Sequence, residues 1–166
     1  KRLDDAKGVK PLAGPEARTI FLGFDQLRDE LLYSNIKGKN PFKDLRVRQA
    51  FIKAINIDAI KKKVMRGASV PAGLMVAPQI NGFNSALNDR PSYDPEGAKK
   101  LLADAGYPDG FEVTMDCPNN RYVNDERICQ ASAAMLAKIG IKVTLLAQPK
   151  SKSVSYTHLR AHETYD

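Results

Sequence analysis

Long hydrophobic runs are missing from this 166-residue sequence. None approaches the roughly 18–20 consecutive apolar residues that span a bilayer, so no transmembrane helix is predicted. The opening segment, KRLDDAKGVK, also lacks the apolar centre of a signal peptide. Because the chain does not begin with methionine, we expect it to be a piece of a longer protein, and the missing signal peptide therefore assigns no compartment.

A cluster of basic residues interleaved with aromatic ones is missing as well. Lysine and arginine outnumber aspartate and glutamate by 26 to 19, which gives a formal net charge of +7. These basic residues are spread along the chain, and no aromatic residues lie among them in a pattern that stacks bases. The distribution favours solvated helix faces over a nucleic-acid groove and leaves an acidic partner surface open.

The composition that remains is that of a globular protein, with 43% hydrophobic and 27% charged residues. A chain of this length forms one ordinary domain with a buried core. Residues 1–18 are predicted to be a loop, and residues 19–24 (TIFLGF) a short buried strand. Residues 68–93, which contain three prolines and little periodicity, are predicted to be a long surface loop.

Three helices are predicted from residues that can cap them. Asp44 precedes apolar residues at helical spacing, and Asp58 precedes a second, shorter pattern of the same kind. Asp94 comes directly before a proline, which suits the first helical position, and Gly106 ends that third helix.

A strand, a helix and a second strand then follow with short links. Apolar and polar residues alternate over residues 111–116 and again over residues 141–147, while residues 124–140 carry an apolar stripe at helical spacing. Such a βαβ unit has parallel strands and a right-handed crossover. The sequence therefore predicts an α/β fold.

The turn MDCPNNRYVND, residues 115–125, joins the first of these strands to the helix. Ligands bind beyond the carboxyl ends of parallel strands, and the N–H groups at a helix start favour an anion there. Arg121 adds a planar fork of donors that matches a carboxylate, Asn119 and Asn120 can donate and accept, and Tyr122 offers a flat face with a polar tip. These four residues are the candidate ligand-binding residues.

A purely structural role for this turn is the alternative. Arg121 would then pair with Asp116 or Asp125 on the surface, and Tyr122 would cover the edge of the sheet. Loops that follow strands carry ligand contacts often but not always, so residue chemistry alone establishes only a corner that suits an anion.

Several stretches, in this order, resemble the family 5 extracellular solute-binding proteins, the oligopeptide-, dipeptide- and nickel-binding components of ABC importers. They are NPFKDLRVRQAFIKAINIDAI, RGASVPAG, YDPEGAKKLLADAGYPDGFEV and CPNNRYVNDERICQASAAMLAKIGIKV. The resemblance covers about residues 19–150. It departs from the family pattern in AINID, which we expect to affect only helix capping, and in CPNN before the arginine, which bears on the ligand.

The resemblance implies part of a two-lobed protein of the type II periplasmic-binding-protein class, about three times longer than this chain. Residues 1–38 would be the hinge-proximal end of the first lobe and residues 39–152 part of the second. Residues 153–166, which do not continue the family pattern, are interpreted as a vector-derived tail.

The resemblance also implies a function. The protein would not be an enzyme and would need no cofactor or metal. It would capture a peptide or similar small solute in the periplasm or outside the cell and deliver it to an ABC permease. Peptide-binding members place an arginine after this strand to engage a ligand carboxylate, and Arg121 occupies the corresponding position.

The two cysteines, Cys117 and Cys129, have two interpretations. They are either a disulfide or two buried thiols, and the periplasmic location that the resemblance implies favours the disulfide. The alternative function is a small metal- or thiol-dependent enzyme that uses them, with His158 and His162 as further metal ligands. The spacing of the cysteines is far from that of common zinc sites, which argues against it.

Overall fold

The computed structural model describes residues 8, 10, 12, 14 and 16–152. The interpreted tail, residues 153–166, and both histidines lie outside this part of the chain. Packing divides the chain into two compact units: residues 1–21 with 72–89, and residues 22–71 with 90–166. The lobe boundary expected after residue 38 concerns a longer two-lobed protein and stays a prediction.

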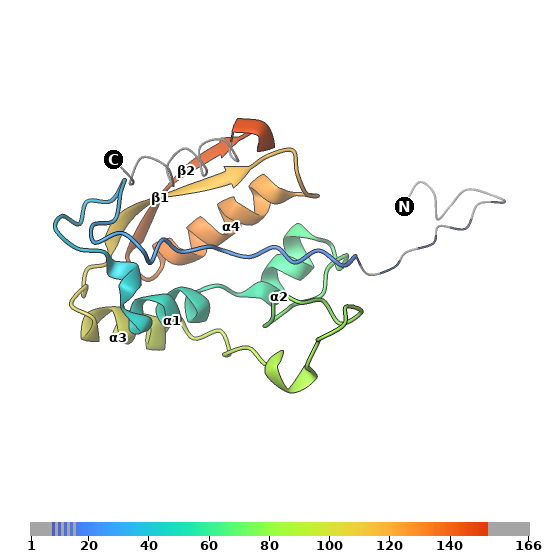
Figure 1. Ribbon diagram of the computed structural model, residues 1–166, viewed down its shortest axis with the longest axis horizontal. Helices are drawn as coiled ribbons and strands as arrows, with labels where there is room; N and C mark the ends of the chain where they lie inside the picture. Colours follow the sequence, from blue (N-terminus) through green and yellow to red (C-terminus); the bar gives the residue numbers. More distant parts are fainter. Residues whose placement is uncertain (1–7, 9, 11, 13, 15, 153–166) are drawn as a thin grey trace. The chain divides into compact units, whose positions relative to one another are not determined.

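The larger unit contains the predicted βαβ motif. Strand β1 (Phe111–Pro118) leads through a short loop to helix α4 (Asp125–Ala137), and strand β2 (Ile141–Gln148) follows. The two strands pair in parallel along their whole length, and α4 lies against them (Figure 1). The parallel pairing and the α/β class predicted from the sequence are confirmed.

The other edge of β1 is also paired. Ser34 forms an antiparallel bridge with Val113, and its hydroxyl donates to the carbonyl oxygen of Glu112 at 2.7 Å. The backbone N–H of Thr114 donates to the carbonyl oxygen of Tyr33 at 3.1 Å. This second edge is thus paired near the start of β1, while the carboxyl end, before the loop, is held by the pairing with β2.

Two glycines allow the strands to begin side by side. Gly110 and Gly140 precede β1 and β2, and both have positive φ angles, 75° and 88°. A Cβ atom on Gly110 would clash with the carbonyl oxygen of Gly140. Only glycine tolerates both the backbone conformation and the close approach, so these two positions fix the register of the parallel pair.

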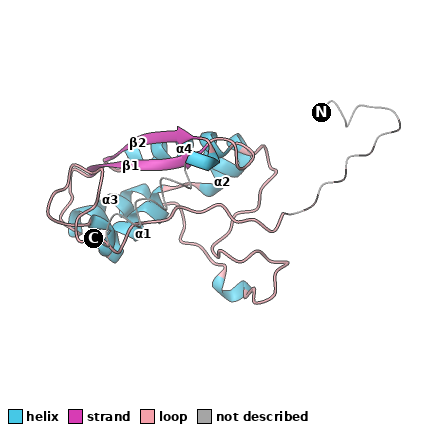
Figure 2. Ribbon diagram, turned by 45° about the horizontal axis from the view of Figure 1, so that its top comes forward, coloured by secondary structure: helices cyan, strands magenta, loops and turns pink. Residues whose placement is uncertain are grey.

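Helices α1 (Leu45–Ala54) and α3 (Pro95–Asp104) pack against each other (Figure 2). Each starts as predicted: the Asp44 carboxylate accepts from the N–H of Arg46 at 2.8 Å, and that of Asp94 accepts from the N–H of Gly97 at 2.8 Å. Before α1, residues Pro41–Lys43 form a 3-10 turn, η1.

The second predicted helix exists, but its predicted cap is wrong. It consists of a short α2 (Ile57–Ala59) continued by a π-helical segment, η2 (Ile60–Val64). Asn56, and not Asp58, caps it, because the Asn56 side-chain oxygen accepts from the N–H of Ala59 at 2.8 Å. Asp58 lies one residue inside the first turn, where its own side chain cannot occupy the capping position.

The strand predicted over residues 19–24 is also wrong. The segment is irregular, and within the described chain no backbone ladder joins it to another strand. Leu22 and Phe24 are nevertheless half-buried and pack against the core, while Phe21 is exposed. The sequence pattern correctly predicted apolar contact, but a strand also needs a neighbouring strand to pair with.

The core of the larger unit is built from α1, α3, α4 and both strands. An aromatic cluster lies at its centre, with ring centroids 4.8–6.3 Å apart: Phe24, Phe42, Phe51, Tyr107 and Phe111. Leu102, Leu136 and Ile141 are fully buried beside it. Burial on this scale anchors β1 and α4, the two elements on either side of the candidate loop.

The smaller unit contains the predicted long loop. Its regular structure among the described residues is one 3-10 turn, η3 (Ser85–Leu87). Asn88 closes the loop on itself, because its side-chain oxygen accepts from the N–H groups of Gly73 and Leu74 at 2.9 and 3.2 Å. In neither unit does the described part of the chain include a helix with the length and apolarity to cross a membrane.

Candidate ligand-binding corner after strand β1

The loop of residues 119–124 links the carboxyl end of β1 to α4. The N–H of Asn119 still donates to the carbonyl oxygen of Gln148 at 3.1 Å, so the pairing with β2 continues one residue beyond β1. At the other end Asn124 adopts a left-handed conformation, with φ at 60°, and its side-chain nitrogen donates to the carbonyl oxygen of Val64 at 3.2 Å. The loop is therefore fixed to the sheet at one end and to η2 at the other.

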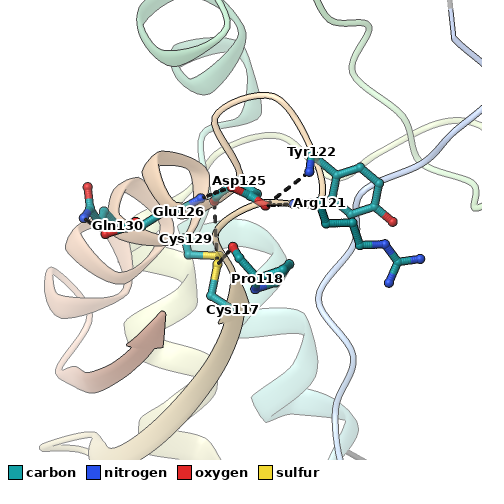
Figure 3. Close-up of a disulfide and its surroundings, with 8 residues drawn as sticks. All are labelled: Cys117, Pro118, Arg121, Tyr122, Asp125, Glu126, Cys129 and Gln130. Atoms are coloured by element: carbon teal, nitrogen blue, oxygen red, sulfur yellow. Dashed lines mark hydrogen bonds between the residues drawn. A yellow bond between two sulfur atoms is a disulfide. The ribbon is translucent and has the colours of Figure 1, made fainter. Parts of the chain in front are cut away.

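The carboxylate of Asp125 occupies the middle of this loop. Its Oδ2 atom accepts from the backbone N–H groups of Arg121 and Tyr122 at 2.9 and 3.2 Å, and its Oδ1 accepts from that of Glu126 at 2.9 Å (Figure 3). The sequence led us to expect N–H groups at the helix start that attract a ligand anion. The protein's own carboxylate occupies one N–H group of the helix start, that of Glu126, and two of the loop before it, so that expectation is wrong for these three groups.

These hydrogen bonds also set the protonation of Asp125. Burial by itself raises the pKa of this carboxyl, but the N–H groups of Arg121, Tyr122 and Glu126 outweigh it and lower the pKa below the ordinary value of 3.8. A carboxyl whose pKa is depressed by folding stabilises the protein above its unfolded pKa. That contribution is lost as the pH falls through the folded value.

We therefore expect the loop to loosen only in acid. The amide resonances of Arg121 and Tyr122, followed by NMR from pH 6 downward, should change in a transition centred below pH 3.8, because the pKa of the folded carboxylate lies below that value. A transition centred at or above pH 3.8 would contradict the assignment. Thr114, whose N–H donates to the backbone carbonyl oxygen of Tyr33 and not to a carboxylate, provides a comparison amide away from the loop.

Arg121 and Tyr122 project together from the loop, away from the cysteines (Figure 3). The guanidinium carbon of Arg121 lies 5.0 Å from the centroid of the Tyr122 ring, a cation–π distance. Arg121 is exposed, and among the described residues its guanidinium forms no ion pair with Asp116 or Asp125. The structural alternative, in which one of these carboxylates neutralises Arg121, is therefore not the arrangement observed.

The two asparagines of the loop differ in their surroundings. The side-chain oxygen of Asn120 accepts from the backbone N–H of Lys150 at 2.7 Å, so it tethers the chain after β2. Asn119 is exposed and lines an open polar hollow of about 320 Å³ together with Tyr122. The hollow is further lined by residues of the α4 start, Asn124, Asp125, Glu126, Arg127 and Gln130. Asn119 and Tyr122 thus line one hollow, whereas the Asn120 side chain holds the segment after β2.

The cysteines lie directly beneath the loop. Cys117, fully buried in β1, and Cys129, in α4, form a disulfide, with Sγ atoms 1.98 Å and Cα atoms 6.5 Å apart. The Cys117 sulfur lies 3.6 Å from the carbonyl oxygen of Asp125. Because a disulfide sulfur has no proton to donate, this is a packing contact. The bond ties the strand to the helix on the side of the loop opposite Arg121.

A disulfide removes both thiols on which the enzyme alternative depends. No group of three or more histidine, cysteine, aspartate or glutamate side chains lies together as a metal site in the part of the chain that the structure describes. His158 and His162 fall outside that part.

Comparison with known proteins adds the decisive observation. The family model described as bacterial extracellular solute-binding proteins, family 5 middle, matches residues 1–166. The chain belongs to this family. The resemblance found in the sequence is confirmed, and members of family 5 are binding proteins for transport.

Individual relatives agree. The chain is 37% identical over 111 residues to the dipeptide-binding protein of Escherichia coli K12, a match that covers 65% of this chain and 21% of the relative. Since 111 residues are 21% of that relative, it is about three times as long as this chain. The chain therefore spans well under half of the relatives that it matches.

Solved structures agree with the fold. The periplasmic binding protein DppA of Helicobacter pylori, in complex with the peptide STSA, has a TM-score of 0.62 and 32% identity, over 73% of this chain and 23% of that one. AgaA of A. tumefaciens R10, in complex with agropinic acid, has a TM-score of 0.65 and 32% identity, over 74% and 25%. This family 5 chain thus has the α/β fold of part of a type II periplasmic binding protein.

Proposed function

We propose that this chain is part of a binding protein that captures peptides, or similar small solutes with a carboxylate, between two lobes. The ligand would bridge the lobes and stabilise the closed form, which then delivers it to an ABC permease. The chain acts by binding alone and carries out no reaction. In this family 5 segment, Arg121 holds the ligand carboxylate, and Tyr122 and Asn119 form the adjoining wall.

The observation that carries this proposal is that Arg121 is exposed and contacts the Tyr122 ring, with no ion pair to an acidic residue in the described chain. A guanidinium in a folded protein commonly pairs with a carboxylate, and a bidentate pair is the strongest such contact. Arg121 is exposed at the carboxyl end of β1 and, within the described chain, stacks on Tyr122 instead of pairing with an acid. Its fork of donors remains available to an incoming carboxylate.

The ligands of the two related structures support the same chemistry. One is the peptide STSA, which ends in a carboxylate, and the other is agropinic acid, an acid by name. A site that recognises the carboxylate and little else would serve both. The carboxylate is therefore the ligand group that we assign to this corner.

The disulfide supports a location in the periplasm or outside the cell. Disulfides persist in oxidising compartments and are rare in the cytosol. A bond between Cys117 and Cys129 therefore fits an exported protein. The permease would then be the membrane partner that receives the ligand.

A comparison of ligand classes tests the proposal. Amide NMR spectra of this chain would be recorded alone, with a pool of short peptides, with a pool of sugars, and with nickel–histidine. We expect the peptide pool to shift resonances of residues 119–122, because a free carboxylate is common to all its members. Shifts produced only by the sugars or only by the nickel complex would contradict the carboxylate assignment and indicate another ligand class.

A further inference from the structure

Asp125 has an unusual place for a helix-capping aspartate. A capping side chain normally belongs to the residue just before the helix, but Asn124, at that position, makes no such hydrogen bond. Asp125 is the first residue of α4, only 5% exposed, and its carboxylate turns back to the loop. Two of its three N–H partners, Arg121 and Tyr122, lie outside the helix.

These two hydrogen bonds determine how the candidate ligand-binding side chains leave the loop. One oxygen atom, Oδ2 of Asp125, holds consecutive N–H groups, so the backbone at Arg121 and Tyr122 is curved around it. Both side chains then project outward on the same side, where the guanidinium lies over the ring (Figure 3). A buried carboxylate with several N–H partners is costly to disturb, which makes this curvature rigid.

The same arrangement limits what the ligand can use. Because Asp125 accepts from the N–H groups of Arg121, Tyr122 and Glu126, those three donors are not available to an anion. A ligand carboxylate would therefore be bound by side chains, and we assign the Arg121 guanidinium as its main partner. The affinity then depends on how well that side chain is held in place beforehand.

We infer that Asp125 is a positioning residue for the carboxylate site: it shapes the loop so that Arg121 is stacked on Tyr122 before the ligand arrives. The inference rests on the proposed function of Arg121 for its consequence in binding. The loop shape itself can be measured without any ligand.

The test compares two substitutions in this chain, Asp125→Asn and Asp44→Asn. An asparagine keeps the size of the side chain, but its NH₂ group cannot accept from an N–H, so part of the clamp is lost. Asp44 is the matched control, because its carboxylate also accepts from a backbone N–H at a helix start, that of Arg46. Its hydrogen bonds in the described chain are to Arg46 and not to residues 119–124. Both variants should unfold at lower urea concentration than the unmodified chain.

Two readouts separate positioning from simple stability. The first is the shift that the Tyr122 ring induces in the Arg121 side-chain protons, which we expect in the unmodified chain and in Asp44→Asn but not in Asp125→Asn. The second is the affinity for an N-acetylated tripeptide with a free carboxyl end. We expect the Kd to rise about tenfold in Asp125→Asn and to be unchanged in Asp44→Asn.

The outcomes are distinguishable. If the ring-induced shift persists in Asp125→Asn, or if both variants lose affinity equally, Asp125 does not position Arg121. If the unmodified chain does not bind the tripeptide, the proposed function fails, and the ring-induced shift alone decides on positioning. Should Asp125→Asn not fold, hydrogen exchange in the unmodified chain still decides: exchange of the Arg121 and Tyr122 amides at the rate of an unprotected peptide would overturn the inference.

Discussion

An Arg121→Ala substitution is expected to weaken the binding of a short peptide with a free carboxyl end by about 10- to 100-fold. Hydrogen bonds to charged groups contribute about 1.5–3 kcal/mol each, and roughly 1.4 kcal/mol corresponds to a factor of ten. The loss should be this large because the guanidinium offers a charged, bidentate contact, while the backbone N–H groups of Arg121, Tyr122 and Glu126 are already held by Asp125. An NMR titration with one N-acetylated tripeptide measures it.

Two further variants make the Arg121 result specific. Arg121→Lys keeps the charge but loses the planar fork, so we expect an intermediate loss. Lys138→Ala removes one positive charge at the far end of α4, where the side chain is exposed, and should leave the affinity within about twofold. Equal losses in Arg121→Ala and Lys138→Ala would mean that net charge, and not the Arg121 contact, attracts the peptide.

Loss of the disulfide is expected to have the largest effect on stability. The bond closes a loop between residues 12 apart in sequence. Restricting an unfolded chain by a loop of this length contributes about 3 kcal/mol. Reduction of the unmodified chain should therefore shift urea unfolding to lower concentration by an amount equivalent to about 3 kcal/mol.

A double substitution supplies the control for reduction. Cys117→Ala combined with Cys129→Ala should be destabilised in the same way and show no further response to reductant. Alkylation of the folded chain without reductant should label neither cysteine. Rapid labelling of both would show free thiols and would return the thiol-dependent alternative to consideration.

Much of the fold could be predicted because its signals are local. Asp44 and Asp94 begin helices through hydrogen bonds to the next two or three residues, and a sequence displays such partners directly. The alternation of apolar residues in β1 and β2 likewise reports which side chains face the core. The order strand, helix, strand, with short links between them, then predicted a parallel βαβ unit for β1, α4 and β2.

The errors in the fold arose where the partner is distant or where two residues compete. Residues 19–24 are apolar enough for a strand, but within the described chain nothing pairs with them. At the second helix both Asn56 and Asp58 are acceptable caps, and the helix starts two residues earlier than a cap at Asp58 would place it. Both cases show tertiary context overriding local preference.

The sequence indicated which residues form the candidate site, but not the hydrogen bonds that hold them. Arg121 and Tyr122 stood out by their chemistry, and the structure brings them into contact. The role of Asp125 was missed, since it was considered only as an ion-pair partner for Arg121. The sequence does hold a signal for it, because an aspartate a few residues after an exposed turn can accept from the N–H groups of that turn. Which N–H groups it reaches depends on the left-handed Asn124, which only a structure reveals.

The measurement that most directly tests the carboxylate assignment compares two forms of one N-acetylated tripeptide, the free acid and the C-terminal amide, on the unmodified chain. The side-chain Nε–Hε resonance of Arg121 is followed by NMR as each is added. Our account predicts a saturable shift of this resonance, and of the amides of residues 119–122, with the acid and none with the amide. Equal shifts with both forms, or shifts elsewhere in the chain that leave Arg121 unchanged, would contradict the claim that Arg121 captures a ligand carboxylate.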